Sequence, residues 1–266
     1  MAEYKVARFR LKRAITHGEN LAKLWNEVPS GRLCTPRAII DRNGYGQLIA
    51  SNVGEIPEDL PLLLGEMLYQ LRSALDSCIY QATVYATQDP PTDEGKLEYP
   101  ITTDKKEWPG LVKRRLMHLS AHVVDTVEKT QPYHKQFPTT EEYIQSPSRS
   151  LGILHELARK DRHRTLHVIG SLPVDVTPSF ILPHGVTVDG FKGSPPSILK
   201  EGTIIGTFHL SGYHLGDEAM VNPKLRTSFG CAEPPLPCDP SDTFERRLRE
   251  MVNTVASIID FFEGNT

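Results

Sequence analysis

Charged residues at helical spacing are the strongest chemical feature of this 266-residue sequence. On a wheel of 100° per residue, Arg72 falls on the flank of an apolar helix face, and Asp76 lies one turn further along the same edge. In a later helical segment Asp161 falls on the apolar face, and Arg162 and His163 follow it directly. A carboxylate that points into a core needs a cationic partner, so we expect Arg72 to pair with Asp161.

This polar set has a structural and a functional interpretation. In the structural one, ion pairs of Arg72 and Asp76 with Asp161 and Arg164 join two core helices. In the functional one, Arg162 and His163 share an open cleft with Arg72, because charged groups also gather at ligand sites and active sites. The sequence leaves both interpretations open.

Three motifs around these residues resemble a widespread group of uncharacterised bacterial proteins. The pattern of that group has an L-R-S-A-L-D-H helix, a Q-P-Y turn and a D-K-H-R segment. The matching segments here are residues 71–76, 131–133 and 161–164. The resemblance covers about residues 11–169 and the last helix, and it implies a helical bundle.

The Arg-x-x-x-x-His core of that pattern is also similar to the motif of HEPN helical bundles, whose metal-independent ribonucleases use Arg and His to bind and cleave RNA. Counted from Arg72, Ser77 stands at the histidine position of this motif. The resemblance therefore implies RNA binding without cleavage, because the general acid-base residue is missing at that position. The alternative is a degenerate ribonuclease that uses Arg72, Asp76, Asp161, Arg162 and His163.

Ten histidines raise the question of a metal site. His118 with His122, and His163 with His167, stand four residues apart, which places two imidazoles on one helix face as zinc sites in bundles require. The first pair spans an expected helix break before Ser120, arginines flank the second pair, and no acidic cluster completes either. We therefore expect no metal ion and no cofactor, and a metal-dependent hydrolase is the remaining alternative.

The elements that must position these residues are amphipathic helices. Apolar residues recur at intervals of three and four over residues 5–28, 59–86, 147–160 and 241–263, and shorter helices are expected at 110–116 and 120–129. Leu71 and Cys78 belong to the central apolar stripe, where a thiol behaves as a small hydrophobe. We expect the stripes at 60–82, 151–158 and 244–262 to pack together.

Two further patterns predict strands. Asn43-Gly44 between short apolar segments predicts a β-hairpin over residues 37–52. Prolines separate β-branched and aromatic runs over residues 171–239, which predicts a small antiparallel sheet. The expected fold class is α+β, one domain over residues 1–266. It consists of a HEPN-like helical bundle (5–170 and 241–263) with an N-terminal β-hairpin and an antiparallel β insertion (171–239) before the C-terminal helix.

Composition limits the partners. Thirty Lys and Arg against 33 Asp and Glu argue against a protein that coats nucleic acid, although residues 1–42 hold nine Lys and Arg against four acids and residues 105–115 hold five more. No apolar run reaches the roughly 20 residues of a membrane span, no export signal is seen, and the four cysteines are scattered. We expect a cytoplasmic binding or interaction module whose partner is RNA or a protein, without a membrane association.

Overall fold

The computed structural model describes residues 4–28, 34–88, 91, 94–134, 140–163, 169–195, 197–231 and 243–265. The chain divides into two compact units. The helical unit contains Met1–Ala22, Pro61–His167 and Glu245–Thr266, and the β unit contains Lys23–Leu60 and Val168–Phe244. The expectation that the whole chain forms one domain stays a prediction.

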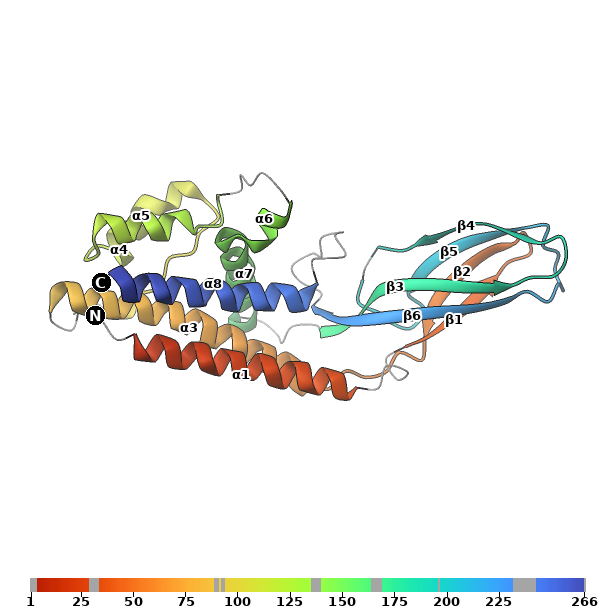
Figure 1. The fold of residues 1–266 in the computed structure, drawn as a ribbon, viewed down its shortest axis with the longest axis horizontal. Coiled ribbons are helices and arrows are strands. Elements are labelled where there is room, and N and C mark those ends of the chain that lie inside the picture. The colour runs from red at the N-terminus through yellow and green to blue at the C-terminus, as the bar shows by residue number, and fades with distance from the viewer. Residues whose placement is uncertain are drawn as a thin grey trace. The chain divides into compact units, whose positions relative to one another are not determined.

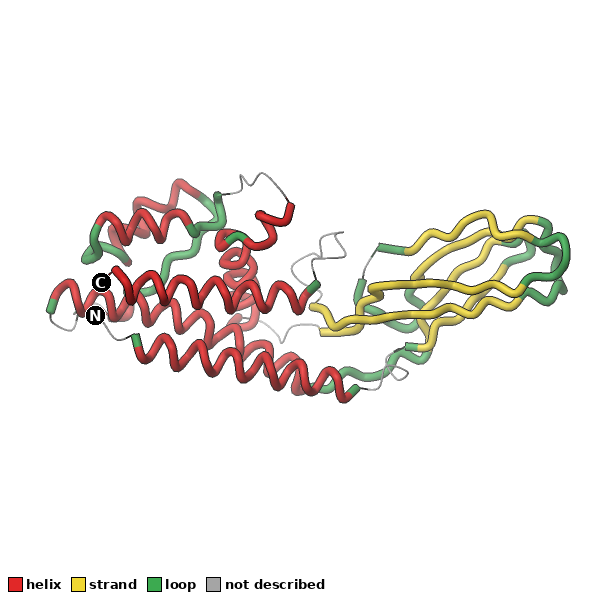
Figure 2. The backbone as a smooth tube through the Cα atoms, viewed as in Figure 1, coloured by secondary structure: helices red, strands yellow, loops and turns green. Residues whose placement is uncertain are grey.

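Three long helices form the centre of the helical unit (Figures 1 and 2). They are α1 (Lys5–Glu27), α3 (Asp59–Thr87) and α8 (Phe244–Asn265). The shorter helices are α4 (Trp108–Arg115), α5 (Ala121–Lys129), α6 (Thr140–Gln145) and α7 (Pro147–His163), with 3-10 turns at Glu94–Lys96 and Lys105–Glu107. All but α6 were expected at these places, and their ends differ from the predicted ones by only a few residues.

The predicted apolar stripes form the core of this unit. Leu71 and Cys78 of α3 are completely buried, as are Leu154 of α7 and Val255 of α8. Desolvation in this core raises the pKa of the Cys78 thiol far above its ordinary value, which keeps the thiol protonated and unreactive.

Contacts between side chains fix how α1 lies against its neighbours. The ring of Tyr4, just before α1, lies 6.0 Å from that of Phe262 in α8. A Cβ added to Gly18 would lie 3.3 Å from the sulfur of Met67, so α1 and α3 approach closely at this glycine. These contacts place α1 against both of the other long helices.

The described part of the β unit contains six strands in two antiparallel sheets. Strands β1 (Thr35–Ile40), β2 (Tyr45–Ser51), β5 (Ile204–Ser211) and β4 (Thr187–Gly193) form a four-stranded sheet in that order. Strand β3 (Ile169–Ile181) pairs with β6 (Met220–Cys231) along their whole length. The predicted hairpin β1–β2 thus continues into the sheet of the insertion through pairing of β2 with β5.

The hydrophobic core of the β unit lies between these two sheets. Leu48 of β2 and Leu210 of β5 are fully buried in it, and residues of β3 and β6 such as Val176 and Leu225 pack against the same cluster. Phe180 and Phe208 meet edge to face across the core, with ring centroids 5.1 Å apart. On the opposite face of the four-stranded sheet, the described residues Tyr45, Gln47 and Thr207 are exposed.

The fold class is therefore α+β, with an N-terminal β-hairpin and antiparallel strands before the C-terminal helix, as the sequence predicts. Within the described residues, no helix combines the length and apolar character that a bilayer crossing needs.

Candidate functional site

Arg72 and Asp76 hold the backbone N–H and C=O groups of one residue, Tyr99. Arg72 is only 8% exposed, and its guanidinium donates to the carbonyl oxygen of Tyr99 and lies 3.3 Å from Oδ1 of Asp76. That same Asp76 oxygen accepts a hydrogen bond from the Tyr99 amide at 2.9 Å. Side chains from two successive turns of α3 therefore satisfy both backbone polar groups of Tyr99. Without these partners the two groups would be buried with no hydrogen bond, which costs free energy.

The Q-P-Y turn supports the same segment from the other side. Gln131 is completely buried, and its side-chain oxygen accepts from the Thr102 amide at 3.0 Å. Its amide nitrogen donates to the carbonyl oxygens of Pro100 and Val127 at 2.9 and 3.0 Å. The buried Tyr99 hydroxyl lies 2.8 Å from Thr130 Oγ1. The L-R-S-A-L-D and Q-P-Y motifs thus both anchor residues 99–102, which is a structural role.

A polar pocket of about 330 Å³ opens beside this anchor, between α1 and α3. We call it the α1–α3 groove. Its lining residues are Val6 and Arg10 of α1, Ser73, Asp76, Ser77, Tyr80 and Gln81 of α3, and Leu97. All of them belong to the helical unit, and Asp76 is common to the anchor and the groove.

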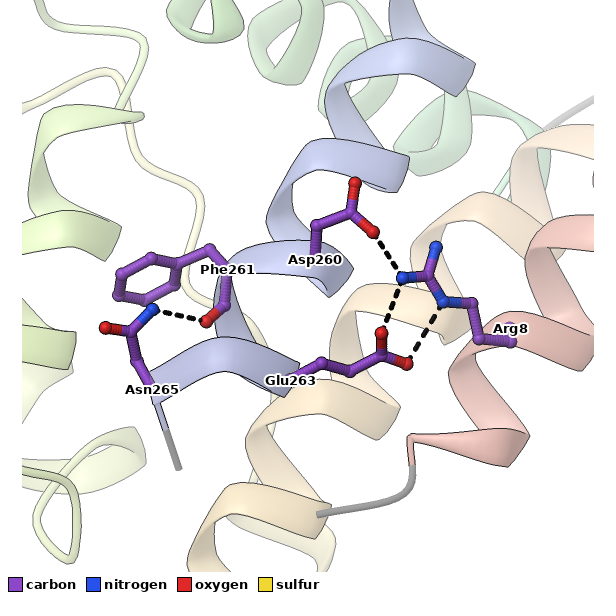
Figure 3. A network of polar contacts seen from close by, with 5 residues as sticks. All are labelled: Arg8, Asp260, Phe261, Glu263 and Asn265. Carbon is purple, nitrogen blue, oxygen red and sulfur yellow. Dashed lines mark hydrogen bonds and ion pairs between the residues drawn. The ribbon is translucent and has the colours of Figure 1, made fainter. Parts of the chain in front are cut away.

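Two arginines of α1 lie at opposite edges of its apolar stripe and have different environments. Arg8 makes a bidentate contact with Glu263 of α8, at 3.1 Å from Nε and 2.6 Å from the terminal nitrogen, and it also contacts Asp260 (Figure 3). Hydrogen bonds to these two carboxylates raise the pKa of Arg8 further above its ordinary value. Arg8 therefore joins α1 to α8.

Arg10 has no such partner. Its Nε is buried, and the guanidinium makes no hydrogen bond or ion pair with any residue that the structure describes. Because residues two apart on a helix point in different directions, Arg10 faces α3 while Arg8 faces α8. In the sequence Arg10 is one of nine Lys and Arg among residues 1–42, and its place at the edge of the apolar stripe of α1 is the signal that singles it out.

Burial dominates the electrostatics of Asp76. Desolvation raises the pKa of its carboxyl above the ordinary value, although Arg72 and the hydrogen bond from the Tyr99 amide act in the opposite direction. The side chain is still 31% exposed, toward the groove. Asp76 therefore presents a carboxylate to the groove whose charge is largely balanced by Arg72.

The remaining predicted site residues lie partly outside the described part. Helix α7 includes Asp161, Arg162 and His163, but their side chains are not among those described, and residues 164–168 lie outside the described ranges. The pairing of Arg72 with Asp161 therefore stays a prediction. The described partners of Arg72 include Asp76, on the same helix edge as the spacing predicts, and the Tyr99 carbonyl, which the sequence does not reveal.

The histidine pair at 118 and 122 is divided by a helix break, as expected. Helix α4 ends at Arg115, and Ser120 caps α5 by accepting from the Val123 amide at 3.4 Å. His122 lies 3.3 Å from Oδ1 of Asn265, and its ring packs 5.6 Å from that of Phe261, at the end of α8. Among the described residues, no group of three or more His, Cys, Asp or Glu side chains is placed to hold a metal ion.

Comparisons with known proteins add no assignment, because no family model, no curated protein and no solved structure matches this chain. The bacterial group and the HEPN bundles therefore remain resemblances of sequence motifs.

Proposed function

We propose that this protein is an RNA-binding module that takes a phosphodiester of the RNA backbone into the α1–α3 groove. The observation that carries the proposal is the partly buried guanidinium of Arg10, which has no partner among the described residues. One guanidinium matches the single negative charge of a phosphodiester and donates to its oxygens. Ser73 and Gln81 line the same groove and supply neutral donors that make no hydrogen bond within the described part.

The charge around the groove supports this ligand. Arg13 is exposed on α1, one turn from Arg10. Arg115, from the second basic cluster, lies close enough to lower the pKa of Asp76 and pairs with Glu98 at 3.0 Å. Asp76 is balanced by Arg72, so it does not cancel the charge of Arg10. The surroundings thus favour an extended anion over a neutral ligand.

Binding without cleavage is favoured by the residue types in the groove. None of the described residues that line it is a histidine, and the Ser77 hydroxyl, at the histidine position of the HEPN-like motif, donates to the Ser73 carbonyl oxygen at 2.7 Å. A serine hydroxyl is too weak an acid and too weak a base near neutral pH to replace a general acid-base histidine.

One observation favours a second candidate function, a metal-independent ribonuclease. The pKa of Asp76 is raised, and a carboxyl group with a raised pKa inside a pocket is a candidate general acid or base. The experiment below therefore includes a cleavage measurement.

The test measures binding of a fluorescein-labelled 12-nucleotide single-stranded RNA by fluorescence anisotropy. We expect Arg10→Ala to weaken binding about tenfold, and the slope of log K against log salt to become shallower by about 0.7, the value for one phosphate contact. Arg249→Ala is the matched control, since Arg249 is an exposed arginine of the same unit paired with Glu245.

Equal losses in Arg10→Ala and Arg249→Ala, or no RNA binding by the folded wild type, would disprove the groove as the RNA site. The same RNA is also incubated with the protein without added metal and resolved on a denaturing gel. We expect intact RNA; cleavage that disappears in Asp76→Asn would instead establish the ribonuclease.

A further inference from the structure

A second pocket lies in the β unit, on the exposed face of the four-stranded sheet. Its volume is about 410 Å³, within the range of small-molecule sites. The side chains that matter are Tyr45 and Gln47 of β2, Thr207 and His209 of β5, and Asp189 and Lys192 of β4. We call it the sheet pocket. It shares no residue with the α1–α3 groove.

A β-bulge in β4 shapes one wall of this pocket. The pairing with β5 shifts between Val188 and Phe191, where Gly190 has a φ of +97°. The extra residue lets Phe191 pack against the hydrophobic core and leaves Asp189 beside His209, at the pocket. Bulges re-aim side chains in this way beside binding sites.

Asp189 is held in a fixed orientation. Its Oδ2 accepts a hydrogen bond from the Ser211 hydroxyl and lies 3.1 Å from Nδ1 of His209. These hydrogen bonds lower the pKa of the Asp189 carboxyl, so it is an ionised acceptor at neutral pH. Because Ser211 donates to Asp189 and does not contact the imidazole, these three residues do not form a hydrolytic triad.

An exposed aromatic ring adjoins this carboxylate. Tyr45 is 62% exposed, and its ring centroid lies 4.5 Å from that of His209. Nε2 of His209 is itself anchored, 3.2 Å from the carbonyl oxygen of Asn43. The tyrosine is therefore a supported aromatic platform that faces solvent, where an apolar ligand surface can stack.

Three polar side chains complete the pocket. Gln47, Thr207 and Lys192 lie directly opposite one another on neighbouring strands, so they form one row on one face of the sheet. None of the three makes a hydrogen bond or ion pair with another described residue. The pocket thus offers a ligand the amide of Gln47, the hydroxyl of Thr207 and the ammonium of Lys192, together with an aromatic ring and a carboxylate.

The charge of the β unit selects the class of ligand. Its two segments contain eight Lys and Arg against thirteen Asp and Glu, so this unit repels polyanions. A sugar ring is neutral, has C–H groups that pack on an aromatic face, and carries hydroxyls that both donate and accept.

We propose that the sheet pocket binds a neutral saccharide. One face of the sugar packs on Tyr45, its hydroxyls donate to Asp189, and others bond with Gln47, Thr207 and Lys192.

The test is a titration of the ¹⁵N-labelled full chain with four neutral trisaccharides: maltotriose, cellotriose, xylotriose and tri-N-acetylchitotriose, each up to about 10 mM. We expect at least one to shift amide resonances of β2, β4 and β5 around the pocket. Tyr45→Ala should weaken that binding about tenfold, and Gln47→Ala about threefold, from loss of the stacking surface and of one polar contact.

Tyr69→Ala is the matched control, because Tyr69 is a tyrosine of similar exposure in the helical unit, and it should leave saccharide binding unchanged. Gln47→Ala keeps the test valid if Tyr45→Ala perturbs the sheet, since the Gln47 side chain makes no described hydrogen bond. The proposal fails if none of the four sugars shifts these resonances, or if both pocket variants bind like wild type. It also fails if octauridylate shifts the same resonances and the sugars do not.

Discussion

Arg72 and Asp76 occupy positions where a helix face turns from core to solvent, and each contacts a backbone group of Tyr99. A free carboxylate at such a depth would be costly, but the guanidinium one turn away balances it. The pair therefore stabilises the fold at the place where it also borders the α1–α3 groove.

Removing Arg72 should be more damaging than removing Asp76. We expect Arg72→Ala to lower the free energy of unfolding by about 2 to 4 kcal/mol, because it leaves a half-buried carboxylate unbalanced and a buried carbonyl without its donor. Asp76→Ala should cost about 1 to 2 kcal/mol, and the double variant should lose less than the sum. Urea unfolding of the three variants checks this; strictly additive losses would contradict the coupling.

The raised pKa of Asp76 predicts a pH dependence. The folded protein holds this proton more tightly than the unfolded chain, so the contribution of Asp76 to stability is complete below its unfolded pKa, near 4, and declines as pH rises through the folded value. Asp76→Asn does not titrate. The stability of wild type relative to this variant should therefore fall between pH 3.5 and 7 in urea unfolding; a rise would show that the pKa is lowered.

At this scale the sequence predicts part of the site. Helical spacing alone places Arg72 and Asp76 on one edge of α3, because the period of 3.6 residues fixes their directions. It does not reveal the backbone groups of Tyr99 as their partners, since a backbone group in a loop has no residue-type signature. The sequence places Arg10 at the edge of the apolar stripe of α1, but whether its guanidinium has a partner is a property of the packed structure.

In the long helices, the spacing of the apolar residues along the sequence determines which face packs into the core. Leu71 is completely buried in the stripe of α3, whereas Leu62 near the start of the same helix is 48% exposed. Leu71→Ala should cost about 2 to 5 kcal/mol through lost burial and a cavity, and Leu62→Ala less than about 0.5 kcal/mol. Thermal or urea unfolding gives both values; a similar cost for the two would contradict the assignment of the stripe.

Some elements and pairings could not be predicted from local sequence patterns. Helix α6 has six residues, too few for a helical period to be recognised. The turn of the β1–β2 hairpin could be predicted from Asn43-Gly44. In the structure Gly44 has a φ of +79°, and Asp41 accepts hydrogen bonds from the amides of Asn43 and Tyr45. The pairing of that hairpin with β5 could not be predicted, because the sequence of neither strand indicates which distant strand it will pair with.

The whole molecule distributes its charge unevenly between the two units. The net charge of −3 is the sum of an acidic β unit and a helical unit with a slight excess of Lys and Arg. The overall composition therefore excludes a strongly basic surface without excluding a basic groove in one unit. The two proposed ligands, an anion for the helical unit and a neutral sugar for the β unit, follow this division.

The pairing of β2 with β5 has a consequence for the synthesis of the chain. Tyr45 meets His209, more than 150 residues later in the sequence. At a translation rate of roughly 5 to 20 residues per second, the β1–β2 hairpin leaves the ribosome roughly 8 to 30 s before its sheet partner exists. During that interval β2 has an unpaired edge, a template for the wrong strand. The four-stranded sheet can therefore be completed only after β5 has been made, which makes its folding a late event in the synthesis of the chain.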